Sequence, residues 1–189
     1  MLPTELGTQA ITRASTFRIP GRAGITGQPL FSIHNATGTA TKVRINKLYV
    51  DMTATVVKAV TVLPPQVRAY KVTVLPTNGT AVTKVLADSI YASSSSVTVK
   101  QDASADGTSS GSALTVTLPA EAVFSGEFAN RMITAVGDTD SYIIDLLKGS
   151  QIVLNALQGV VVMLDYLLAT QNAVTDMWLV TCEWSEFSL

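Results

Sequence analysis

Few side chains in this sequence of 189 residues could carry acid–base or nucleophilic chemistry. The chain has one histidine, His34, and one cysteine, Cys182. Because a serine or cysteine nucleophile commonly needs a histidine base beside it, a hydrolase-like site would have to include His34. Ser32 and Ser141 could serve as nucleophiles, but neither lies in a G-x-S-x-G elbow. We expect His34, which ends a predicted strand, to make a local hydrogen bond, and we expect no catalytic residue.

Metal-binding patterns are equally sparse. A zinc site needs more nitrogen and sulfur ligands than one histidine and one cysteine supply. Asp102, Ser104 and Asp106 match the first ligand positions of an EF-hand loop, but its closing position is Ala113, whose side chain has no oxygen. We therefore interpret this stretch as a flexible polar loop and expect no metal and no cofactor.

The last segment of the chain alternates more regularly than any other. One face carries large or apolar side chains: Trp178, Val180, Cys182 and Trp184. The other face is mostly polar: Leu179, Thr181, Glu183 and Ser185. This alternation predicts a strand with one buried face, on which Cys182 is a small hydrophobic residue and not a nucleophile.

Similar alternation and many β-branched residues predict strands along most of the chain. We expect strands at residues 30–34 and 42–57, and an apolar, strand-rich region from residue 142 onward. The Asn78-Gly79 pair predicts a hairpin of residues 72–75 with residues 80–86. Polar turns every 8–12 residues or so are typical of all-β sandwiches and barrels. The predicted fold is an antiparallel, jelly-roll-like β-sandwich.

Two stretches depart from this pattern. Prolines and glycines interrupt residues 1–29, which we interpret as an extended N-terminal arm ahead of one sandwich domain at residues 30–189. We predict that the arm contacts another subunit, with Arg13, Arg18 and Arg22 as candidate assembly contacts. Residues 88–112 are rich in Ser, Asp and Gly and predict a long loop around a short strand, and residues 121–135 predict a short helix or a loop.

Charged residues are scarce. They make up 14% of the chain, against about 25% in a typical soluble domain, and the net charge is −1. The longest apolar run, VVVML, is far shorter than the roughly 20 residues of a membrane-spanning helix, so we expect no membrane span. A weakly charged surface favours association, which predicts a homo-oligomer or another assembly in which protein covers most of the surface.

The charges are unevenly divided along the chain. Residues 1–86 contain ten Lys or Arg and two acids, whereas residues 87–189 contain three and twelve. The two halves could interleave in one sandwich and pair internally, or a basic face could meet an acidic face of a neighbouring protein. Nucleic-acid binding by the basic half is a third possibility, but no basic run or interleaved aromatic residues support it.

The C-terminal stretch IVLNALQGVVVMLDYLL, followed by DMWLVTCEWSEF, resembles the ending of tailed-bacteriophage virion proteins. In that family, similar strands close a β-sandwich. The middle of the chain, KLYVDMTATVVKAVTVLPPQVRAYKVTVLP with SADGTSS, is similar as well, so the resemblance spans about residues 17–187. It implies a virion component assembled in the host cytoplasm, and it identifies no catalytic residue.

Composition and resemblance together predict a non-enzymatic structural subunit. We expect a capsid decoration, or cement, protein that binds the major capsid protein and stabilises the shell. A tail, neck or fibre-base component is the nearest alternative. A carbohydrate- or receptor-binding sandwich is another, and it would need exposed aromatic residues on loops, for which Tyr91, Phe124 and Phe128 are available.

Overall fold

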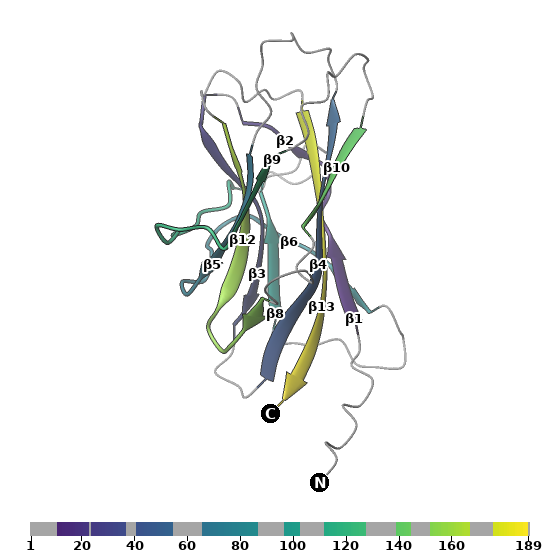
Figure 1. Cartoon of the computed structure of the whole chain (residues 1–189), viewed down its shortest axis with the longest axis vertical. Coiled ribbons are helices and arrows are strands. Elements are labelled where there is room, and N and C mark those ends of the chain that lie inside the picture. The colour runs from purple at the N-terminus through teal and green to yellow at the C-terminus, as the bar shows by residue number, and fades with distance from the viewer. Residues whose placement is uncertain are drawn as a thin grey trace.

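The computed structural model describes residues 11–22, 24–36, 41–54, 66–86, 97–102, 112–127, 139–144, 152–166 and 176–188. Within these ranges all regular secondary structure is β-strand, and every strand pair is antiparallel. Two twisted sheets stand face to face along the long axis of the molecule (Figure 1). The predicted antiparallel β-sandwich is therefore confirmed.

Sheet 1 is built around its two longest strands. Its order is β10 (Thr139–Ile144), β4 (Thr41–Ala54), β13 (Asp176–Ser188), β1 (Ile11–Ser15) and β7 (Lys84–Leu86). Two short strands add to it, since β11 (Val153–Leu154) pairs with β4 and β2 (Ile19–Pro20) pairs with β13. β4 and β13 pair over nearly their whole length and form the longest strand pair of this sheet.

Sheet 2 has the order β6 (Thr80–Ala81), β8 (Val97–Gln101), β3 (Gly27–Asn35), β12 (Gly159–Asp165), β5 (Gln66–Val72) and β9 (Phe124–Glu127). Pro29 lies inside the central strand β3, where proline is normally excluded. The register shifts between Val162 and Met163, opposite Phe31 and Pro29. This bulge accommodates a residue that cannot donate a ladder hydrogen bond.

The main core lies between the inner faces of the two sheets. The predicted core strand contributes four side chains that are wholly buried: Trp178, Val180, Cys182 and Trp184. On the outer face, Glu183 is half-buried, but Thr181 and Ser185 are buried. The Thr181 hydroxyl lies 2.9 Å from that of Ser15 on the neighbouring strand. The predicted register of β13 is therefore correct, and lateral contacts bury part of its polar face.

A second apolar cluster lies on the outer face of sheet 2. Its buried members come from β5 and β12: Tyr70, Val72, Val161 and Met163. Residues 112–123, which we call the cover segment, place Val116, Leu118 and Ala122 against this cluster. β12 is therefore buried on both faces, which explains its unbroken apolar run GVVVML.

The expected N-terminal arm is wrong for residues 11–22 and 24–29, while residues 1–10 lie outside the described ranges. β1 is inserted between β13 and β7, and Ala14 and Ile19 belong to the main core. Prolines and glycines break the pattern after residue 16. The preceding sequence ITRAS still alternates between exposed and buried residues, and these five residues are enough to form a paired strand. The sandwich therefore begins well before residue 30.

Two further expectations fail. Residues 80–86 do not form a hairpin with residues 72–75, because Thr80–Ala81 pairs with β8 in sheet 2 and Lys84–Leu86 pairs with β1 in sheet 1. Asn78 and Gly79 do adopt the positive φ values of a tight turn, 57° and 69°. The helix or loop predicted for residues 121–135 is wrong for residues 124–127, which form the edge strand β9. Residues 121–123 have no regular secondary structure, as the loop alternative expects, and residues 128–138 lie outside the described ranges. The short strand expected within residues 88–112 is confirmed as β8.

Candidate functional site

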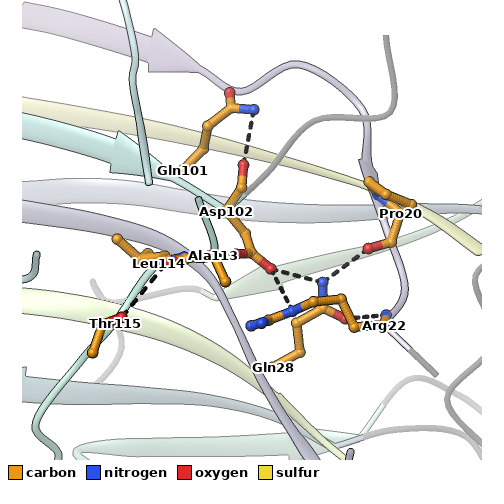
Figure 2. A network of polar contacts seen from close by, with 8 residues as sticks. All are labelled: Pro20, Arg22, Gln28, Gln101, Asp102, Ala113, Leu114 and Thr115. Carbon is orange, nitrogen blue, oxygen red and sulfur yellow. Dashed lines mark hydrogen bonds and ion pairs between the residues drawn. The ribbon is translucent and has the colours of Figure 1, made fainter. Parts of the chain in front are cut away.

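The most extensive polar cluster described by the structure surrounds Asp102, directly after β8 (Figure 2). Asp102 is wholly buried. Its Oδ1 accepts a hydrogen bond from the backbone N–H of Leu114 at 2.8 Å. Its Oδ2 accepts one from Gln28 Nε2 at 3.0 Å and lies 3.0 Å from Arg22 Nε in an ion pair. We call Arg22, Gln28, Asp102 and Leu114 the polar junction.

Gln28 extends the polar junction to the N-terminal segment. It is wholly buried, its Nε2 also donates to the carbonyl of Pro20 at 2.8 Å, and its Oε1 accepts from the backbone N–H of Arg22 at 2.9 Å. The junction thereby joins β2, β3, β8 and the cover segment, which lie far apart in the sequence (Figure 2).

This arrangement fits a structural role for Asp102. Both carboxylate oxygens already face N–H donors, which a calcium ion would have to displace. Ser104 and Asp106, the other candidate ligands, lie outside the described residues. Across the described ranges, no three residues of His, Cys, Asp or Glu gather as a metal site.

The three arginines predicted as assembly contacts do not share one environment. Arg22 forms an ion pair with buried Asp102 of its own chain, and 33% of its side chain remains exposed. Arg13 lies on the outer face of sheet 1, with its Nε 3.9 Å from Glu183 Oε1. Arg18 is exposed. Arg13 and Arg18 are thus exposed, whereas Arg22 is partly exposed and engaged within its own chain, and all three stay predictions as assembly contacts.

Part of the uneven charge division is neutralised within the chain. Three ion pairs each join a base of residues 1–86 to an acid of residues 87–189: Arg13–Glu183, Arg22–Asp102 and Arg68–Asp165. Two lysines bridge the sheets at their edges, since Lys71 Nζ donates to Val153 O at 3.1 Å and Lys84 Nζ to Val97 O at 2.9 Å. Among the described residues, these contacts favour internal pairing over a free basic face.

His34 differs from its expected environment. It is 2% exposed, and neither ring nitrogen has a hydrogen-bond partner among the described residues, so the predicted local hydrogen bond is wrong. Burial lowers the pKa of its imidazole. The sequence places His34 at a strand end, but β3 continues to Asn35 and keeps the ring inside the fold.

Cys182 has the inert environment that the alternation predicts. It is a free thiol with no exposed surface. Burial, and secondarily the negative charge of Glu183, raises the pKa of the thiol far above its ordinary value. The thiolate needed for nucleophilic chemistry is therefore disfavoured at neutral pH.

Sequence reasoning missed the large apolar side chains that remain exposed. Their exposed fractions range from 42% to 61%: Ile11, Phe17, Val74, Leu75, Val85, Val123 and Leu157. Most lie in turns or on edge strands, where no periodic pattern marks them. Gly159 and Val72 are register partners on the adjacent strands β12 and β5. Leu157 lies two residues before Gly159 and Val74 lies two residues after Val72, so both are at the same end of this strand pair.

We call Val74, Leu75 and Leu157 the end cluster, because they lie at one end of sheet 2. Leu157 adopts a φ of 60°, a left-handed conformation that costs energy for a bulky residue. Hydrogen bonds hold it there, since its N–H donates to Asn35 O at 2.9 Å. A rigid turn thus presents an aliphatic side chain to solvent.

Comparison with known proteins finds no match for this chain. No protein-family model matches this chain, and no significant match is found among curated proteins or solved structures. None of the described segments is a helix long and apolar enough to cross a membrane.

Proposed function

We propose that this chain is a non-enzymatic structural subunit of a phage virion, and that it works as a capsid decoration protein. The observation that carries the proposal is the surface: among the described residues, seven large apolar side chains are more than 40% exposed, and only 14% of the chain is charged. Such a surface is poorly suited to a free monomer and well suited to burial against other protein.

The internal use of the basic residues supports the same function. Arg22, Arg68, Lys71 and Lys84 are engaged within the subunit, so a strong electrostatic attraction to nucleic acid is not expected. Association would depend on apolar contacts, at about 25 cal/mol for each Å² of apolar surface removed from water. The resemblance of the C-terminal stretch to tailed-phage virion proteins supports the virion as the setting.

The end cluster is the proposed contact with the shell or with a neighbouring copy. Val74, Leu75 and Leu157 follow or precede the paired ends of adjacent strands, and backbone hydrogen bonds fix the turn of Leu157, so binding would order little additional chain there. A preorganised apolar patch of this kind binds without a large entropic penalty, which a protein that stabilises a shell requires.

Catalysis and sugar binding find less support. The sole histidine and sole cysteine are both buried. Stacking on sugars or receptors would use exposed aromatic side chains. Tyr91 and Phe128 lie outside the described residues, and among the side chains whose exposure is described Phe17 is the one large aromatic residue that is mainly exposed.

The test combines sedimentation of the purified chain with binding to phage shells that lack it. We expect an oligomer at micromolar concentration, or co-sedimentation with the shells. A triple variant, Val74→Ser, Leu75→Ser and Leu157→Asn, should lose association and keep its melting temperature, because these side chains are exposed. Lys47→Gln, on the exposed outer face of sheet 1, is the matched control and should behave as the unmodified chain. A soluble monomer that binds neither itself nor shells would contradict the proposal, and binding to isolated tails alone would replace the decoration role with a tail role.

A further inference from the structure

His34 is the penultimate residue of β3, one of the central strands of sheet 2. Its register partners are Thr98 on β8 and Gly159 on β12, and Gly159 is in turn paired with Val72 on β5. Val72 belongs to the apolar cluster under the cover segment. The imidazole is therefore part of a row of side chains that crosses four strands near one end of the sheet.

The ring is packed too closely to leave room for solvent. A Cβ atom on Gly159 would lie 2.6 Å from His34 Cδ2, so the ring rests directly on the glycine backbone. The residue is 2% exposed, and both Nδ1 and Nε2 are buried without a partner among the described residues. A charged imidazolium would need two hydrogen-bond acceptors here, and this packing supplies none.

No carboxylate is positioned to compensate such a charge among the described residues that share this face. Beside β8 lie Lys100, whose Nζ donates to Pro76 O at 2.9 Å, and Asp102, four residues beyond Thr98. The Asp102 carboxylate is already engaged by Arg22, Gln28 and the Leu114 N–H. On β12, Asp165 lies six residues from Gly159 and pairs with Arg68 of β5 at 3.2 Å. On the cover segment, Glu121 is exposed. A proton on His34 would therefore be uncompensated, with a lysine as the nearer charge.

We propose that His34 is an acid-sensitive element of the fold: protonation of its ring requires β3, β8 and β12 to loosen, so mild acid weakens sheet 2. The proposal does not depend on the phage assignment. It assigns to the only histidine a role in setting the lower pH limit of the folded subunit.

The direction follows from proton linkage. The imidazole has an ordinary pKa of 6.5 in the unfolded chain, and burial lowers its pKa in the folded chain. The unfolded state thus binds more protons as the pH falls through 6.5, which favours unfolding until the folded-state pKa is reached. Between pH 7.5 and pH 5.5 the unfolding equilibrium constant should rise from this residue alone, by at most about tenfold. Burial raises the pKa of Asp165 and so acts in the opposite sense, but this effect cancels when variants are compared.

Two measurements test the proposal. The first is an NMR pH titration of the folded protein, in which a single histidine gives a single set of imidazole signals. We expect no titration near pH 6.5 while the protein stays folded. A midpoint near 6.5 in the folded state would overturn the proposal.

The second measurement is urea unfolding at pH 7.5 and pH 5.5, followed by the fluorescence of the buried Trp178 and Trp184. The acid-induced rise in the unfolding equilibrium constant should be smaller in His34→Gln and in His34→Leu than in the unmodified chain, whatever their absolute stability. The missing factor is the contribution of the imidazole, at most about tenfold. Arg18→His, which places an imidazole at an exposed position, should keep the full rise. An unchanged pH dependence in both His34 variants would refute the proposal. If neither variant folds, the NMR titration decides alone.

Discussion

Adjacent residues in this sandwich can have opposite environments, and this contrast makes single positions informative. In β13, Trp184 is wholly buried in the main core, while Glu183 lies on the outer face and pairs with Arg13. The difference arises because successive side chains of a strand point to opposite faces. A displacement of the strand by one residue would exchange the two environments.

Neighbouring substitutions in β13 should therefore differ sharply. Trp184→Ala should lower the free energy of unfolding by about 3–5 kcal/mol, because it leaves a large cavity and removes the hydrogen bond from Nε1 to Glu186. Glu183→Ala should change it by less than about 0.5 kcal/mol, since its ion pair is long and partly exposed. Equal effects in urea unfolding would show that the register is wrong.

Gly159 is a position at which the addition of a single Cβ atom should lower stability. A Cβ there would lie 2.6 Å from His34 Cδ2 and 2.7 Å from the carbonyl oxygen of Ile33. Gly159→Ala should cost about 1–3 kcal/mol by overpacking. His34→Ala in the same chain should restore only part of the loss, because the Ile33 carbonyl belongs to the backbone. Gly27→Ala, where the nearest atom lies 3.3 Å away on the Asp165 side chain, is a milder control in the same thermal denaturation series.

At the scale of elements, local alternation predicts strands that carry their own pattern of buried and exposed residues. It fails for segments whose structure depends on pairing with distant parts of the chain. β13 and β4 were predictable, because each carries its own pattern of buried and exposed residues. β1 was missed because prolines and glycines just beyond ITRAS hide a short strand that pairing with β13 stabilises. The expected hairpin failed because residues 80–86 cross from sheet 2 to sheet 1, and no local signal marks that crossing.

The polar junction was equally out of reach of sequence reasoning. Arg22, Gln28, Asp102 and Leu114 are spread over more than ninety positions, and only the folded chain brings them together. The sequence pattern marks Asp102 only as a possible calcium ligand. It does not reveal that the carboxylate is buried and bound by donors from other segments. The exposed apolar residues of the end cluster lie in turns and carry no periodicity that could have revealed them.

The polar junction should be a major source of stability for the N-terminal segment. Asp102→Ala removes a wholly buried carboxylate and leaves the Leu114 N–H and Gln28 Nε2 without this acceptor. We expect a loss of about 3–5 kcal/mol in urea unfolding, as for other broken buried pairs. Asp165→Ala, which removes the more exposed pair with Arg68, should cost less than about 1 kcal/mol. A smaller loss for Asp102→Ala than for Asp165→Ala would contradict the structural role of the junction.

At the scale of the whole molecule, a well-packed sandwich carries a surface that is short of charge. Three ion pairs join the basic first half of the chain to the acidic second half among the described residues. Several large aliphatic side chains remain exposed in turns and on strands, among them Val74, Val85 and Leu157. The proposed role requires such a surface, because it assigns the exposed apolar side chains to contacts with other protein.

The position of the chain in an assembled particle tests this account most directly. Cryo-electron microscopy of intact virions should show the two-sheet sandwich in ordered copies on the capsid shell, with the end cluster of Val74, Leu75 and Leu157 covered by a neighbouring protein. Particles whose shell lacks this density, or copies whose end cluster faces solvent throughout, would contradict the account.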